Sequence, residues 1–133
     1  MTNANIVLAQ SLYAAFGRGE INYIIDALAA DVHWECVGRQ VDFPTFGPRQ
    51  GRSAVAEFFS LVGSELSFYD FSPNEFFAAG DKVFCLGHYA MTVNRTGRRM
   101  ESDWIHVFTL ADGKVTDFRE FLDTARAVEA WRN

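Results

Sequence analysis

Apolar residues recur at helical spacing in three segments of the first half of the chain. Residues 6–16 carry one such stripe, which ends at Gly17, and residues 21–28 carry a second. A third stripe covers residues 55–62, where Ser53 is a suitable N-cap. Each stripe occupies one face only, so the pattern predicts three helices that need an apolar surface to pack against.

The remaining pattern is that of strands. A short strand is predicted over residues 32–37 and a loop over residues 38–51, which contain Pro44 and Pro48. Later strands are predicted over residues 66–71, 76–79, 82–94, 100–110 and 115–122, with Pro73 as an interruption and a short helix over residues 124–131. Helices grouped before a run of antiparallel strands predict one α+β domain over residues 1–133. We expect a bent, mostly antiparallel sheet wrapped by three helices around an apolar pocket.

The strand predicted over residues 82–94 has apolar residues at both alternations, which is typical of a strand covered on both faces. Three helices cover only one face of a sheet. We therefore expect a homodimer in which a second copy covers the other face, with Tyr89, Met91 and Phe121 as candidate contacts.

Composition narrows the possible partners. The net charge of −5 argues against nucleic acid or an anionic membrane surface, because both require a basic footprint. Thirteen Phe, four Tyr and three Trp supply unusually large aromatic surfaces for a thick core or an apolar pocket. Two cysteines are too few for a disulfide framework, and no apolar run approaches the length of a membrane span. We expect a reduced, cytoplasmic protein.

No metal or cofactor is expected. His33, His88 and His106 lie in different predicted elements, and neither a His-x-x-x-His nor a Cys-x-x-Cys spacing occurs. Glycine-rich phosphate loops of the standard spacings are also absent from the sequence. Cys36 and Cys85 lie among apolar strand residues, where a thiol behaves as a small hydrophobe rather than a nucleophile.

The order of predicted elements, together with the sequences of residues 47–59 and 104–125, resembles a known superfamily. The chain is similar to the SnoaL-like and ketosteroid-isomerase-related branch of the nuclear transport factor 2-like proteins, over nearly its whole length. This resemblance implies a cone-shaped fold with an apolar pocket. The superfamily contains isomerases, epoxide hydrolases, dehydratases, cyclases and non-enzymatic binders, so the fold alone does not select a reaction.

The resemblance also implies roles for single residues. Tyr13 resembles the tyrosine of steroid isomerases that donates to the developing oxyanion, while the two acids of those enzymes fall on Cys36 and Ile105. Glu120 corresponds to a catalytic acid of the limonene-epoxide-hydrolase relatives, whose Arg-x-Asp pair has no counterpart here. SnoaL-type polyketide cyclases place their acid/base carboxylate in the region of Glu120 and a histidine on the neighbouring strand, as His106 is.

Glu120 is also selected by strand alternation. It shares a predicted face with Thr116, Phe118 and Leu122, which would line an apolar cavity. Burial there disfavours the charged form of a carboxyl group, and this suits a general acid or base. The alternative is a structural ion pair, for which Arg126 is the best-placed arginine in the sequence.

The position of His106 depends on the preceding hairpin turn. A two-residue turn at residues 112–113 places Glu120 opposite Ile105 and turns His106 to the other face. A three-residue turn at residues 111–113 with a bulge places Glu120 opposite Trp104, and His106 then shares its face. The sequence permits both turns.

Two functions follow from these residues. The first is an enzyme that binds a small, largely apolar carbonyl or cyclic molecule and moves a proton with Glu120 and His106, without a cofactor. The second is a non-catalytic module for small-ligand binding or dimerisation. The residues expected to contact the ligand are Tyr13, Phe16, Trp34, Phe59, His88, Trp104 and Phe118.

Overall fold

One curved six-stranded sheet organises the protein, whose computed structural model describes residues 3–132 and leaves residues 1, 2 and 133 outside the described part. The strand order is β2-β1-β6-β5-β4-β3, and every neighbouring pair is antiparallel except β1 and β6. The strands are β1 (Leu28–Cys36), β2 (Gly47–Gln50), β3 (Leu66–Ala79), β4 (Lys82–Val93), β5 (Arg98–Ala111) and β6 (Lys114–Leu122). The predicted α+β architecture with a bent, mostly antiparallel sheet is confirmed.

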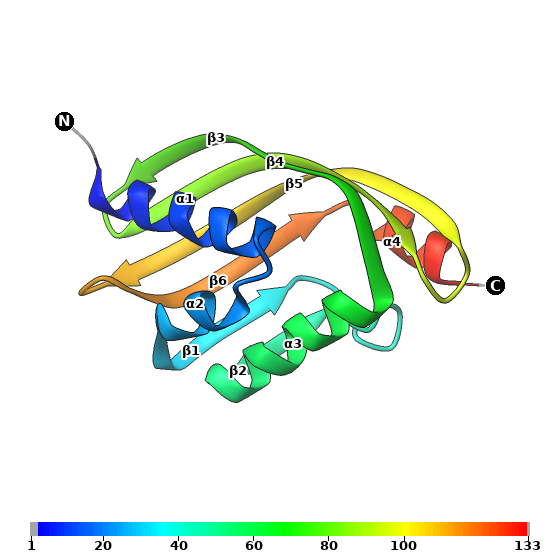
Figure 1. The fold of residues 1–133 in the computed structure, drawn as a ribbon, viewed down its shortest axis with the longest axis horizontal. Helices are drawn as coiled ribbons and strands as arrows, with labels where there is room; N and C mark the ends of the chain where they lie inside the picture. The colour runs from blue at the N-terminus through cyan, green and yellow to red at the C-terminus, as the bar shows by residue number, and fades with distance from the viewer. Residues whose placement is uncertain (1–2, 133) are drawn as a thin grey trace.

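Four helices complete the fold: α1 (Ala4–Gly17), α2 (Ile21–Asp26), α3 (Arg52–Glu65) and α4 (Thr124–Trp131). Helices α1, α2 and α3 lie on one side of the curved sheet, and α4 lies beside the turn that joins β4 to β5 (Figure 1). The apolar stripes of α1 and α3 face the sheet, where Leu12, Val55 and Phe58 are buried. None of the helices in residues 3–132 combines the length and the apolar composition needed to span a membrane.

Three element boundaries differ from the sequence prediction. The second helix ends at Asp26, because Leu28 already pairs with Val115 as the first residue of β1. Helix α3 begins at Arg52, whose guanidinium donates two hydrogen bonds to the Leu28 carbonyl, so the predicted cap Ser53 lies inside the helix. The predicted loop of residues 38–51 contains the short strand β2, which pairs with β1.

Strand β3 continues through Pro73, where the sequence predicted an interruption. β3 is an edge strand that pairs only with β4, so the missing N–H of proline breaks no second ladder. The register shifts between Phe68 and Asp70 and again between Pro73 and Glu75. These irregularities bend the strand, and Figure 1 shows β3 curving over the helical side of the sheet.

The two faces of the sheet differ from the expected assignment. Tyr89 and Met91 lie on the helical side and are buried, so they are not candidates for a dimer contact, and that part of the prediction is wrong. Lys82 and His88 share the opposite alternation on β4, which leaves their side of the strand facing outward. Phe121, by contrast, is on the outer face and 42% exposed.

Gly87 provides the space that a tryptophan of the next strand occupies. It pairs with Trp104, and a Cβ atom at this position would overlap the Trp104 ring and lie 2.6 Å from the carbonyl oxygen of Ser72. Gly87→Ala should therefore lower the free energy of unfolding by about 1–3 kcal/mol through overpacking. Gly63→Ala is the matched control: it adds a methyl group in open space on α3 and should raise the free energy by about 0.5–1 kcal/mol. Urea denaturation measures both, and equal effects would contradict the packing argument.

The homodimer stays a prediction, with the outer sheet face as its interface. Ile105 and Phe121 pair in register there, each 42% exposed. Lys82 at the start of β4 and Asp103, opposite His88 near the middle of the face, provide opposite charges for a two-fold arrangement. Sedimentation should show a dimer at micromolar concentration and a folded monomer for Phe121→Glu. Val41→Glu, a substitution at an 85% exposed position, should remain dimeric. A monomeric wild-type protein would refute the prediction.

Candidate functional site

An apolar cavity of about 90 Å³ lies between the helical face of the sheet and the helices. Side chains from α1, α2, α3, the loop of residues 37–46 and the inner face of the sheet line it. The aromatic part of the wall includes Phe16, Trp34, Phe59, Phe68, Phe71 and Phe118. Such a lining, with a few polar groups directed into it, is typical of small-molecule sites.

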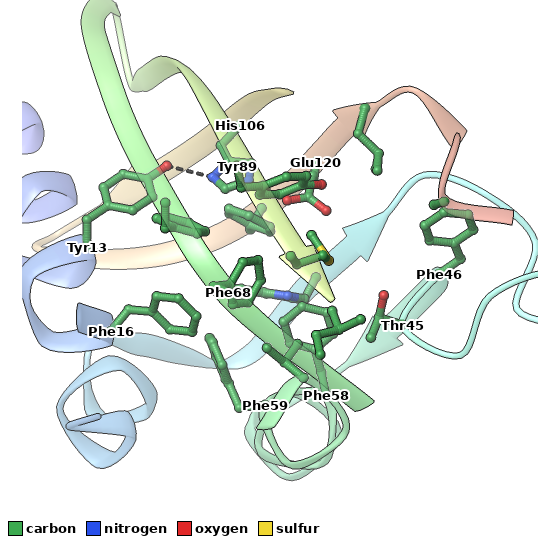
Figure 2. Close-up of a pocket in the computed structure, with 18 of the residues that line it drawn as sticks. Tyr13, Phe16, Thr45, Phe46, Phe58, Phe59, Phe68, Tyr89, His106 and Glu120 are labelled. Atoms are coloured by element: carbon green, nitrogen blue, oxygen red, sulfur yellow. Dashed lines mark hydrogen bonds and ion pairs between the residues drawn. The ribbon is translucent and has the colours of Figure 1, made fainter. Parts of the chain in front are cut away.

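The polar groups of this cavity form a hydrogen-bonded chain of three side chains. The Tyr13 hydroxyl lies 2.6 Å from Nδ1 of His106, and Nε2 of His106 lies 2.6 Å from Oε2 of Glu120. Figure 2 shows Tyr13 reaching His106 from α1, with Glu120 beside the histidine. The side chains of His106 and Glu120 are only 5% and 14% exposed. We call these three residues the Tyr13–His106–Glu120 chain.

A bulge in β6 brings His106 and Glu120 together. The hairpin turn has two residues, Asp112 and Gly113, both with positive φ. The register then shifts by one between Thr109 and Leu110, because β6 contains an extra residue at Thr116, whose hydroxyl donates to the Thr109 carbonyl. As a result Glu120 pairs with His106 rather than with either predicted partner.

One arrangement of protons satisfies the whole chain. An ionised Glu120 only accepts hydrogen bonds, so Nε2 of His106 donates to it and Nδ1 is left as the acceptor. The Tyr13 hydroxyl then donates to Nδ1. Burial, assisted by the nearby Cys85 and Glu120, raises the pKa of Tyr13 well above its usual value, which keeps this proton on the phenol.

The indole of Trp104 packs against one face of the His106 imidazole. Its ring is stacked on the His106 imidazole, with centroids 3.9 Å apart and planes 19° from parallel. Trp104 is 2% exposed and does not border the cavity, in contrast to the expectation that it contacts a ligand. The indole fills the space left by Gly87 and limits the movement of the imidazole.

Glu120 has no basic partner within ion-pair distance in residues 3–132 other than His106. Arg126, the alternative suggested by the sequence, lies 3.3 Å from Asp123 instead. Cys36 pairs with Glu120 in register on the neighbouring strand. Burial and the charge of Glu120 raise the pKa of both the Cys36 thiol and the Tyr89 phenol. Glu120 is therefore surrounded by neutral groups and by histidine.

Tyr89 is a cavity residue that sequence reasoning missed. It lines the cavity from β4, and in the view of Figure 2 it lies close to His106 and Glu120. Both the odd- and the even-numbered positions of β4 carry apolar residues, so the sequence did not show which set faces the cavity. Lys82, His88 and Thr92 share one alternation, and this polar bias was the available signal that Tyr89 faces inward.

Two other expected positions lie outside the cavity. His88 is on the outer face, where its Nδ1 is 2.8 Å from Oδ1 of Asp103, and this hydrogen bond raises the pKa of His88. Ile105, the position that the steroid-isomerase resemblance assigned to the second acid, also faces outward. Its neighbour His106 is the residue that meets Tyr13. The other expected contacts, Tyr13, Phe16, Trp34, Phe59 and Phe118, all border the cavity.

No cluster of three or more His, Cys, Asp or Glu side chains in residues 3–132 has a geometry suited to a metal ion. Burial raises the pKa of Cys85 to about 11, so its thiol is kept protonated next to Tyr13. The groups available for chemistry are therefore hydroxyl, imidazole and carboxyl groups, which exchange protons and donate hydrogen bonds.

The family model of the SnoaL-like domain matches residues 9–118, which is most of the chain. The protein belongs to the SnoaL-like family. The resemblance inferred from residues 47–59 and 104–125 is confirmed. Comparison with curated proteins finds no match.

Solved structures of SnoaL-like and related proteins share the whole fold. An NTF2-like protein from Burkholderia xenovorans LB400 is 29% identical, with a TM-score of 0.89, and the alignment covers 99% of this chain and 98% of that one. TerC, co-crystallised with polyporic acid, is 27% identical with a TM-score of 0.86, over 98% and 100% of the two chains. A protein from Mesorhizobium loti described as a SnoaL-like polyketide cyclase is 18% identical with a TM-score of 0.72, over 91% and 99%, and shows the fold alone.

Tyr13→Phe tests the contribution of the Tyr13–His106–Glu120 chain to stability. The substitution keeps the ring but removes the donor to Nδ1 of His106, which leaves a buried acceptor unpaired. The free energy of unfolding should fall by about 1–3 kcal/mol. Tyr23→Phe removes a hydroxyl from a residue that is 47% exposed, and its effect should stay within about 0.5 kcal/mol. Urea titrations of both variants decide this, and a Tyr13→Phe protein as stable as the wild type would show that the bond is not formed in solution.

Proposed function

We propose that the cavity binds a small, largely apolar carbonyl or cyclic molecule and that Glu120 transfers a proton to or from it, without a cofactor. The observation that carries this proposal is the partner of Glu120. The carboxyl group of Glu120, in an aromatic cavity, is hydrogen-bonded to an imidazole instead of an arginine or a lysine. A permanent cation would hold the carboxylate in its charged form, whereas imidazole leaves it able to gain and lose a proton.

The chemistry needs only groups of this protein. Glu120, as a carboxylate, removes a proton from a carbon next to a carbonyl group: the C–H bond breaks, an O–H bond forms on Glu120, and the electron pair moves to the carbonyl oxygen. A hydroxyl donor then stabilises the enolate oxygen. Tyr89 beside Glu120 has such a hydroxyl, and burial raises its pKa. The proton of the Tyr13 hydroxyl is already used in its bond to Nδ1 of His106. His106 holds Glu120 through Nε2 during the transfer.

Two outcomes are open to the enolate. Return of the proton to a different carbon completes an isomerisation, and attack of the enolate carbon on a second carbonyl group closes a ring. TerC, a structure of the same fold, was co-crystallised with polyporic acid. A ligand of that type combines carbonyl groups with apolar surface, as the lining of this cavity requires.

A non-catalytic binding module is the second candidate. One observation favours it: Cys36 and Ile105 stand where the resemblance placed the two acids of the steroid isomerases, and Ile105 faces away from the cavity. Such a module would bind the same class of ligand through the aromatic lining and would not exchange its protons. Both candidate functions therefore predict ligand binding, but only the enzyme predicts turnover.

Glu120→Gln separates them. Ligands are first identified by thermal shift with a panel of small apolar ketones, and turnover is then measured as deuterium exchange at the carbon next to the carbonyl group, by NMR in D₂O. The amide keeps the shape of Glu120 but is not basic enough to remove a proton from carbon at neutral pH. Exchange should fall by a factor of about 10²–10⁴, while the dissociation constant changes less than about threefold.

Glu101→Gln is the matched control, because Glu101 lies on the outer face with a side chain 61% exposed. It should leave exchange and binding unchanged. Binding of ketones without exchange by the wild-type protein would favour the non-catalytic module. Exchange that survives Glu120→Gln would exclude Glu120 as the base.

A further inference from the structure

Thr45 is a buried polar residue of the cavity wall. It lies in the loop between β1 and β2, is 6% exposed and lines the cavity. The other two buried polar residues, Ser102 and His106, form hydrogen bonds to protein groups. No hydrogen bond joins the Thr45 hydroxyl to another group in residues 3–132, and its oxygen is not among the fully enclosed unpartnered atoms of that range, which are Trp34 Nε1, Arg49 Nε and Trp104 Nε1. A hydroxyl on an apolar cavity wall without a protein partner is free to hydrogen-bond a ligand, as the few polar groups of small-molecule sites do.

The loop holds this hydroxyl in a fixed place. Phe43 and Phe46, on either side of Thr45 in the sequence, stack with their centroids 5.0 Å apart and are each 3% exposed. The Phe46 N–H donates to the Phe43 carbonyl, and Arg49 donates to the carbonyl of Pro44. Because the backbone before and after Thr45 is fixed, its hydroxyl is pre-organised rather than free to find a partner elsewhere.

Thr45 and the Tyr13–His106–Glu120 chain lie at different parts of the cavity. In Figure 2, Tyr13 and Thr45 are on opposite sides of the view, with Phe16, Phe58 and Phe59 along the wall between them. Glu120, at the end of the chain, lies between Tyr13 and Thr45 in this view, so the cavity has the chain on one side, Thr45 on the other and aromatic rings along the wall. A ligand that satisfies both has a hydrogen-bonding group at each end.

We propose that Thr45 is a second polar anchor that determines ligand specificity. The ligand carries a hydroxyl or carbonyl oxygen that hydrogen-bonds to Thr45, remote from the carbon at which Glu120 moves a proton. This inference rests on the proposed function and narrows its substrate class to molecules with an apolar, ring-containing middle and oxygen at both ends. It assigns Thr45 to binding and orientation, and no step of the proton transfer passes through it.

The first test needs no ligand. Thr45→Val keeps the shape of the side chain and removes the hydroxyl, so the melting temperature should stay the same or rise by a few degrees. Thr96→Val is the matched control, because the Thr96 hydroxyl lies 2.6 Å from the Ala130 carbonyl and has a structural role. Its melting temperature should fall. A fall for Thr45→Val equal to that of Thr96→Val would show that the hydroxyl is used within the protein, and would overturn the proposal.

The second test compares ketones that differ by one hydroxyl group. The pairs are 1-tetralone with 6-hydroxy-1-tetralone, 1-indanone with 5-hydroxy-1-indanone, and deoxybenzoin with its 4′-hydroxy derivative. In at least one pair the wild-type protein should bind the hydroxylated member about 3–10-fold more tightly by calorimetry, the effect of one hydrogen bond. Thr45→Val should remove that preference and leave the affinity for the unsubstituted ketone unchanged.

The outcomes distinguish the two proposals. Ketone binding without a hydroxyl preference in any pair, or with a preference that Thr45→Val preserves, overturns the role of Thr45 and leaves the proposed function standing. If no ketone of the panel binds or exchanges deuterium with the wild-type protein, the proposed function fails, and the anchor role fails with it.

Discussion

The two hydrogen bonds of the His106 ring connect the parts of this structure that surround the cavity. Through Nδ1 the imidazole ties β5 to Tyr13 of α1, and through Nε2 it ties β5 to Glu120 of β6. These partners are 93 and 14 residues away in the sequence, so the position of the first helix over the sheet is coupled to the geometry of the carboxylate. In the apolar interior such bonds are stronger than in water, and a broken one leaves an unpaired polar group that is costly to bury.

The aromatic residues around this chain have a second effect. They exclude water from Tyr13 and Tyr89, whose pKa values burial raises, and the same burial raises the pKa of the Cys36 and Cys85 thiols. Every acidic O–H or S–H of these four groups is thereby held in its neutral form. Glu120 and His106 are the remaining ionisable groups that line the cavity.

Periodicity predicted the helices and the strands because each element buries one continuous face, as Leu12 and Phe58 do. It could not predict which side of β4 faces inward, since both alternations are apolar, and Tyr89 and His88 were placed on the wrong faces for that reason. His106 pairs with Glu120 because β6 has an extra residue at Thr116. No local sequence pattern predicts the position of this bulge. The burial of Thr45 could not be predicted for a different reason. Thr45 is buried because its loop folds over the cavity, and a loop has no periodic pattern of apolar residues.

The bulge at Thr116 also has an evolutionary consequence. Because side chains alternate along a strand, one inserted or deleted residue exchanges the two faces of everything beyond it. Loss of the extra residue in β6 would turn Glu120 outward and bring its neighbours Arg119 and Phe121 to the inner alternation. A single codon deletion at this position would thus place Arg119 and Phe121 on the side of the cavity that Glu120 now occupies, and would turn the buried Phe118 outward. A family built on this sheet has a short mutational route from one chemistry to another.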